Sequence, residues 1–169
     1  MPSAISANTG AGTPQSSSFV STAMADAAIC AWDAKYTFHN WRPVTATRMA
    51  DVDGNDATEA DTGWSSFIIT PPFPDYVSGH STFSGAGSTV LAQFYGTDSI
   101  AFTTVSDFLP NVTRRFTSFS AAADEATISR LYGGIHFRFA NEDGLSSGLD
   151  IGAWAFGNYL QPKSNRSRH

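Results

Sequence analysis

Three short stretches of this sequence combine basic side chains, histidines and glycine in patterns that suit the binding of an oxyanion. In the first, Lys35 and Arg42 lie seven positions apart, about two helical turns, so both can project from one face of a helix. The neighbouring aromatic residues Trp32, Phe38 and Trp41 indicate a partly buried surface. A buried cation needs an anion, so this pattern indicates an anion site. The alternative interpretation is a cationic edge exposed to solvent.

The second stretch is Ser78-Gly79-His80, at the start of an expected helix. A serine hydroxyl and unpaired backbone N–H groups at the positive end of a helix dipole form a seat for an oxyanion. His80 can act there as a general acid or base, because an unperturbed histidine has a pKa of about 6.5. The alternative is a simple helix N-cap followed by an incidental histidine.

In the third stretch, Ser129-Arg130 is followed, after Gly133-Gly134, by His136. The arginine and the histidine can converge across the glycine turn, although a structural salt bridge explains this pattern alone equally well. Together, three cations, a helix N-terminus and two histidines suit a tetrahedral or trigonal-bipyramidal oxyanion. One histidine would attack or ligate the central atom while the other moves protons.

The elements that must position these residues are mainly helical. Small and apolar residues at helical spacing predict helices over residues 19–38, 81–95, 120–132 and 145–160. The last helix is expected to bury Leu149, Trp154, Ala155 and Tyr159, while residues 112–119 are ambiguous. Residues 51–75 read as a long polar loop, a type that is usually functional or partly disordered. The small residues of 84–88 would let another helix approach closely.

Three regions follow from the composition. Residues 1–18 are expected to form a flexible lead-in, residues 19–162 one helical oxyanion-binding domain, and residues 163–169 a basic, solvated tail. The single cysteine, Cys30, excludes an intramolecular disulfide and a cysteine-based zinc site, and is expected to be buried as a small residue.

Charge and hydropathy narrow the class of protein. A net charge of −5 and a pI near 5.1 argue against nucleic acid and anionic membranes as partners. No apolar run approaches 18 residues, so a soluble protein without a membrane span is expected. The compartment stays open: a secreted or periplasmic location fits if any signal is absent from this chain.

The three stretches resemble the vanadium-dependent haloperoxidases and the superfamily that these enzymes share with type-2 phosphatidate phosphatases and bacterial class A acid phosphatases. The superfamily pattern is Lys-x6-Arg-Pro, then Pro-Ser-Gly-His, then Ser-Arg-x5-His. This chain has Lys35 to Arg42-Pro43, Ser78-Gly79-His80 and Ser129-Arg130 to His136, over a resemblance spanning about residues 20–160. It departs at Val77, where the family usually has proline.

The resemblance implies an all-α helical bundle and a role for each matched residue. The vanadate oxygens would be held by Lys35, Arg42, Ser78, Gly79 and Arg130. His136 would be the axial ligand to the metal, and His80 the acid-base partner; with Lys35, these would be the catalytic residues. Trp32 and Phe73 match an aromatic pair that shapes the halide site in chloroperoxidase-like members, and Phe73 favours chloride or bromide.

The implied activity is vanadate-dependent oxidation of halide by hydrogen peroxide to a hypohalous-acid equivalent, which halogenates a small organic acceptor. One alternative is a phosphomonoesterase that binds phosphate in the same seat and forms a phosphohistidine at His136. A second is a truncated, non-catalytic domain, because family members are usually longer, with many helices ahead of the first motif. The chain is therefore expected to be a fragment, such as the C-terminal half of the family fold, a minimal member of the family, or half of an assembly. If helices are missing, exposed apolar faces predict a homo-oligomer.

Overall fold

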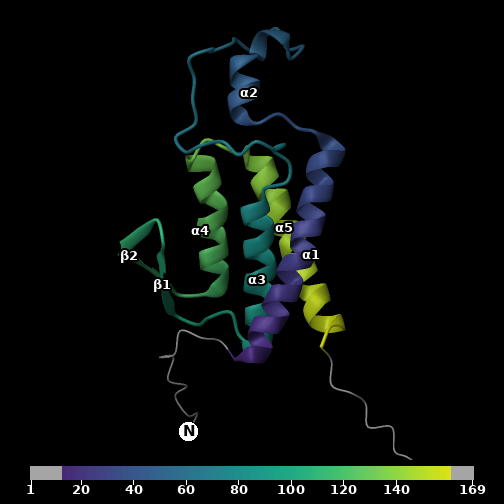
Figure 1. Cartoon of the computed structure of the whole chain (residues 1–169), viewed down its shortest axis with the longest axis vertical. Helices are drawn as coiled ribbons and strands as arrows, with labels where there is room; N and C mark the ends of the chain where they lie inside the picture. Colours follow the sequence, from purple (N-terminus) through teal and green to yellow (C-terminus); the bar gives the residue numbers. More distant parts are fainter. Residues whose placement is uncertain (1–12, 161–169) are drawn as a thin grey trace, which may run out of the picture.

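Four long helices run alternately up and down beside one another (Figure 1). In the computed structural model, which describes residues 13–160, they are α1 (Pro14–Phe38), α3 (Gly79–Tyr95), α4 (Phe119–Tyr132) and α5 (Arg138–Asn158). A short helix α2 (Pro43–Arg48) and a 3-10 turn (Ala50–Val52) follow α1. The predicted all-α bundle is confirmed, while the predicted tail of residues 163–169 and the lead-in up to residue 12 lie outside the described residues.

Local capping sets where α1 begins and ends. Thr13 is the N-cap, its hydroxyl accepting a hydrogen bond from the Ser16 N–H at 3.3 Å, and Pro14 occupies the first helical position. The helix therefore begins five residues before the expected Phe19, and the prediction that residues 14–18 belong to a lead-in is wrong. His39 then ends the helix in the left-handed conformation, with φ of 50°.

Serine caps also start α3 and α4. The Ser78 hydroxyl accepts from the Ser81 N–H, and the Ser118 hydroxyl accepts from the Ala121 N–H at 3.0 Å. These two helices lie within two residues of their predicted limits. Helix α5, by contrast, begins seven residues before the expected Leu145.

A two-stranded hairpin that was not predicted spans residues 102–116 and overlaps the ambiguous segment 112–119 only in part. Strands β1 (Phe102–Ser106) and β2 (Leu109–Phe116) pair antiparallel, with Phe102 opposite Phe116. Most of their residues are exposed, and the hairpin projects beside α4 (Figure 1). It decorates the bundle without entering its core.

Small residues line the contact between α3 and α5. A Cβ added at Gly85 would lie 2.7 Å from the Leu145 carbonyl oxygen, and one added at Gly144 would lie 2.8 Å from the Ser78 carbonyl oxygen. The predicted close approach at residues 84–88 is therefore confirmed. Gly144 lies inside α5, because only glycine allows this close approach. The glycine therefore does not mark the start of the helix, which begins earlier, at Arg138.

The buried faces of α1 and α5 carry alanine and glycine rather than large apolar residues. Of the residues predicted to be buried in α5, Ala155 is buried, but Leu149 is 42% exposed and Trp154 is 55% exposed. Tyr159 is partly buried against the core. Cys30 is exposed, contrary to prediction, because the inward positions of α1 are Ala23, Ala27, Ala31 and Lys35.

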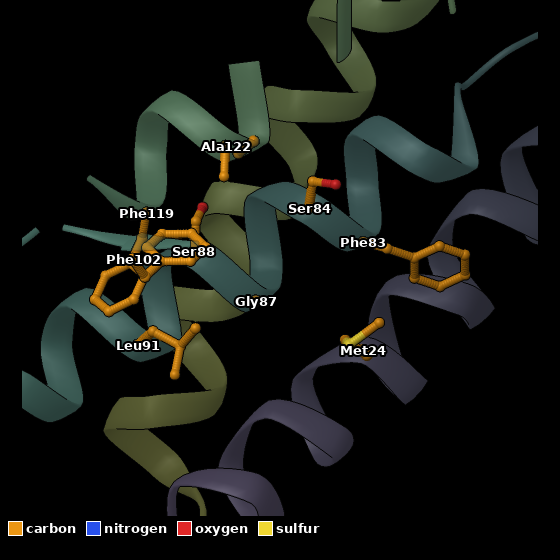
Figure 2. A pocket seen from close by; sticks show the side chains of 10 residues that line it. Met24, Phe83, Ser84, Gly87, Ser88, Leu91, Phe102, Phe119 and Ala122 are labelled. Atoms are coloured by element: carbon orange, nitrogen blue, oxygen red, sulfur yellow. The ribbon is translucent and has the colours of Figure 1, made fainter. Parts of the chain in front are cut away.

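An apolar groove of about 250 Å³ lies on one side of the bundle (Figure 2). Met24 of α1, Phe83 and Leu91 of α3, and Ala122 of α4 contribute to its lining. None of the helices within residues 13–160 is long and apolar enough to cross a membrane.

The up-and-down order brings four helix ends together. The C-termini of α1 and α4 and the N-termini of α3 and α5 lie at the same end of the bundle, and the segment between α2 and α3 crosses it (Figure 1). The Ile68 N–H donates to the Gly133 carbonyl, and the Asp75 N–H donates to the Asn40 carbonyl, which holds this segment in place. All three sequence motifs therefore meet at one end.

Candidate oxyanion site

Lys35 reaches from the last turn of α1 into the loop that precedes α3. Its side chain is fully buried, and Nζ donates to the carbonyl oxygens of Pro74, Asp75 and Val77 at 3.0, 3.0 and 2.6 Å. Burial, followed by the charge of neighbouring Arg42, lowers the pKa of Lys35 to about 8. The ammonium therefore clamps the loop that leads to Ser78.

Arg42 follows α1 and lies across the same loop. Its Nε donates to the Phe73 carbonyl at 2.8 Å, and Nη1 donates to the Ile135 carbonyl at 2.7 Å. Nη1 also lies 3.0 Å from His136 Nε2 and 3.7 Å from Asp75 Oδ1. These contacts tie the first and third motifs together.

Asp75 sets the tautomer of His136. The fully buried carboxylate places Oδ1 2.6 Å from His136 Nδ1, which favours the tautomer with its proton on Nδ1. Burial lowers the pKa of His136, while Asp75 acts in the opposite direction. A neutral His136 then presents a lone pair on Nε2, the atom that can ligate or attack a central atom.

Two buried guanidinium nitrogens lack a hydrogen-bond partner among the described residues. They are Nη2 of Arg42 and Nε of Arg130. Burial lowers the pKa of both side chains, yet an arginine remains protonated at neutral pH. Leaving a charged donor unpaired in a buried position is costly, so both nitrogens suit an anion placed beside His136.

The N-terminus of α3 forms another part of the site. Ser78 is fully buried, and its N–H donates to the Ala140 carbonyl at 2.8 Å. Gly79 occupies the first helical position, where backbone N–H groups have no partner within the helix. A Cβ at Gly79 would lie 3.3 Å from the Trp32 ring, so glycine keeps this helix end close to the aromatic side chain.

His80 lies at the exposed rim of the site. The residue is exposed, yet partial burial, followed by the charge of Arg130, lowers the pKa of His80 to about 4. His136, Arg42 and Lys35 act in the same direction. His80 is therefore neutral at pH 7, and its low pKa makes it a weak base as long as the surrounding positive charge is not offset.

The aromatic pair lies beside these cations. The ring centroids of Trp32 and Phe73 are 5.3 Å apart, and Lys35 Nζ is 5.9 and 5.2 Å from them. The Arg42 guanidinium carbon is 5.0 Å from the Phe73 centroid. The candidate halide residues thus form an aromatic wall of the same site.

Asp75 is the site residue that sequence reasoning missed. It stands in the segment Pro74-Asp75-Tyr76 before the second motif, 61 positions from His136. An acidic residue three positions before Ser78 was a weak signal, because nothing local connects it to a distant histidine. Within residues 13–160, no three His, Cys, Asp or Glu side chains come together as ligands for a metal cation.

Comparison with known proteins identifies the family of this chain. The model of a family described as the VCPO second helical-bundle domain matches residues 15–164. The chain belongs to this family. A vanadium chloroperoxidase from Curvularia inaequalis is 33% identical over 86 residues, covering 45% of this chain and 14% of that protein.

Solved structures of vanadium-dependent haloperoxidases share the fold. A bacterial vanadium-dependent iodoperoxidase matches with a TM-score of 0.75 and 42% identity, over 85% of this chain and 33% of that one. A holo-type bacterial vanadium-dependent chloroperoxidase matches with a TM-score of 0.67 and 23% identity, over 82% and 34%. The chain therefore spans about a third of the length of these structures, and the predicted resemblance to the vanadium haloperoxidases is confirmed.

Proposed function

We propose that this chain binds vanadate beside His136 and uses hydrogen peroxide to oxidise halide to a hypohalous-acid equivalent. The observation that carries the proposal is the pair of buried guanidinium nitrogens without a hydrogen-bond partner among the described residues, Arg42 Nη2 and Arg130 Nε, together with His136, whose pKa is lowered by burial. Cationic donors and an imidazole lone pair together suit an oxyanion whose central atom accepts a ligand.

Different residues of this chain would bind different parts of vanadate. Arg42 and Arg130 would donate to its oxygens, with Ser78 and Gly79 contributing a hydroxyl and a backbone N–H. His136 would ligate through Nε2, which must first exchange its contact with Arg42 Nη1. When bound, vanadate would supply the Lewis acidity that activates peroxide toward halide.

Lys35 and His80 would act on charge and protons. With a pKa of about 8, Lys35 is largely cationic at neutral pH, and it would reach the oxyanion by exchanging one of its three carbonyl partners. His80, with a pKa of about 4, would accept a proton from peroxide. A bound oxyanion would raise the pKa of His80, since it offsets the surrounding positive charge.

The halide would approach along the aromatic wall of Trp32 and Phe73, close to the charge of Lys35. Identity is higher to the iodoperoxidase, at 42%, than to the chloroperoxidase, at 23%. Iodide is therefore the first halide to test, followed by bromide and chloride. A small phenolic compound represents the organic acceptor.

The deciding experiment measures halogenation of a phenolic dye with hydrogen peroxide and iodide or bromide, with and without added orthovanadate. We expect halogenation only when vanadate is present. In parallel, ⁵¹V NMR titration should show binding to the unsubstituted chain and its loss in His136→Ala. Stoichiometric vanadium on His136→Ala would remove the proposed ligand, whereas His80→Ala should keep vanadium and lose turnover.

A phosphomonoesterase is the second candidate, because the same donors and the Nε2 lone pair of His136 suit phosphate as a substrate. Hydrolysis of p-nitrophenyl phosphate, inhibited by vanadate and without halogenation, would select it. No activity in either assay would favour a non-catalytic domain. This outcome is included because the chain covers about a third of the length of the matched structure.

A further inference from the structure

The hydroxyl of Ser78 contacts a buried chain of hydrogen-bonding side chains, Ser81 and Asn141, that the proposed mechanism does not use. Ser81 Oγ lies 2.9 Å from Ser78 Oγ and 3.4 Å from Asn141 Oδ1. Ser78 and Ser81 are fully buried, and Asn141 of α5 is 3% exposed. The chain therefore runs from α5 to the oxyanion seat without contact with bulk water.

The number of available protons determines the direction of the hydrogen bonds among Asn141, Ser81 and Ser78. The Ser81 hydroxyl carries a single hydrogen, so it cannot donate to Ser78 Oγ and Asn141 Oδ1 at once. The Asn141 Nδ2 atom, meanwhile, is buried without a partner. A half-turn of the amide about its last torsion exchanges nitrogen and oxygen. Nδ2 then donates to Ser81 Oγ, which frees the Ser81 proton for Ser78, while Oδ1 takes the position without a partner.

We propose that Asn141 is a positioning residue that directs the Ser78 hydroxyl toward the bound oxyanion. In this order, Asn141 Nδ2 donates to Ser81 Oγ, and Ser81 donates to Ser78 Oγ. The Ser78 hydroxyl has then accepted its internal hydrogen bond and keeps its own proton for the oxyanion. The role of the oxyanion in this inference rests on the proposed function, whereas the order of donors rests on the buried chain alone.

The rest of α5 holds the same residue in place. The Ala140 carbonyl accepts from the Ser78 N–H at 2.8 Å, and Gly144 allows the helix to lie against the Ser78 backbone. The backbone of Ser78 is thereby set by α5. What remains free is rotation of its hydroxyl, which the Asn141–Ser81 chain restricts.

The test replaces the donor with an acceptor. In Asn141→Asp, the carboxylate accepts from Ser81, Ser81 then accepts from Ser78, and the Ser78 proton is withdrawn from the oxyanion. We expect the Kd for orthovanadate, measured by ⁵¹V NMR, to rise at least about tenfold, and Asn141→Ala to raise it less, since a hydrogen bond to a charged group typically exceeds one between neutral groups. Asn158→Asp adds the same charge at an exposed position on α5 and should bind like the unsubstituted chain.

A second substitution separates the relay from simple charge repulsion. In a Ser81→Ala background, the relay is broken, so Asn141→Asp should weaken vanadate binding by a clearly smaller factor than in the unsubstituted background. An equal factor in both backgrounds, or unchanged binding by Asn141→Asp, overturns the proposal while leaving vanadate binding itself intact.

A measurement without any ligand tests the order of donors directly. The side-chain amide protons of Asn141, followed by ¹H–¹⁵N NMR of the unliganded chain, should shift in Ser81→Ala because one of them loses its acceptor. Unmoved amide protons overturn the proposal. If the unsubstituted chain binds no vanadate, the proposed function fails, and the NMR result still decides whether the Asn141–Ser81 bond exists.

Discussion

The two halves of the bundle are stabilised by opposite means. The polar end comprises Lys35, Arg42, Asp75, Arg130 and His136. Its charged groups are wholly or partly buried, and Lys35, Arg42 and Asp75 contact partners in other elements, whereas Arg130 Nε has no hydrogen-bond partner among the described residues. The apolar half, which comprises Ala23, Ala27, Ala86, Val90 and Ala155, packs small side chains from α1, α3 and α5. Burying charge costs free energy unless every partner is present, whereas packing of small apolar side chains is favourable in itself. Packing in the apolar half therefore stabilises the contact between the helices, whereas the polar end forms the candidate site.

The outer surface adds to this contrast. Many large apolar side chains of the described residues face outward, including Ile29 and Phe38, which are 70% and 60% exposed. Alanine and glycine occupy the inside, so the helices approach closely. Large apolar residues on the outside indicate surfaces that pack against further protein, and the relatives of known structure are about three times as long as the matched region.

The largest effect is expected from Asp75→Asn, which tests the polar end. The substitution removes the carboxylate that pairs with His136 and lies 3.7 Å from Arg42. Breaking a buried ion pair costs about 3–5 kcal/mol, so the free energy of unfolding in urea should fall by that order. Asp150→Asn, at an exposed position on the same bundle, should change it by less than about 0.5 kcal/mol. A similar loss in both variants would contradict the assigned role of Asp75.

The helix contact that joins the two halves gives the next effect. In Gly148→Ala, the added Cβ would collide with the Thr82 carbonyl oxygen, which is backbone and cannot rotate away. Overpacking of this kind costs typically about 1–3 kcal/mol, measured by urea unfolding. Gly157→Ala on the same helix meets nothing within 4 Å and should be neutral or stabilising, by up to about 1 kcal/mol. If both variants unfold alike, the close α3–α5 contact is wrong.

A smaller effect should appear with pH and belongs to the polar end alone. His80 has a pKa of about 4 in the folded chain, below its ordinary 6.5, so the unfolded chain binds more protons between these values. Stability should therefore fall as pH drops from 6.5 toward 4. His80→Gln should lose less stability than the unsubstituted chain between pH 7 and pH 5 in urea titrations. Parallel losses would show that other groups govern the dependence.

The last prediction concerns the exposed apolar surface. We expect the chain to self-associate, as a homo-oligomer, through the outer face of α1. The double substitution Ile29→Lys and Tyr36→Lys, at positions two helical turns apart on one face, should shift the sedimentation coefficient toward that of a monomer, with little change in the unfolding midpoint because both residues are exposed. A monomeric unsubstituted chain at micromolar concentration would contradict the prediction.

Helix positions and motif residues were largely predictable because their signals are local. Ser78-Gly79 marks a helix start through its side-chain cap, and α3 begins within two residues of its predicted limit. Thr13-Pro14 carries a similar local signal, a capping threonine before proline, but the prediction overlooked it. The start of α5 was misplaced because Gly144 resembles a helix boundary when read alone. The inward direction of α5 was also misjudged, because Leu149 and Trp154 would normally mark a buried face.

The sequence by itself determined which residues are candidates for the chemistry: the cations, the histidines and the Ser-Gly helix start all follow from residue types and short spacings. Only the tertiary structure decided that Lys35 clamps a loop, that Asp75 sets the proton of His136, and that Asn141 stands behind Ser78. These partners are brought together by the alternating helices from positions far apart in the chain. Hydrogen bonds act over about 3 Å, so no pattern along the chain records which distant groups will meet.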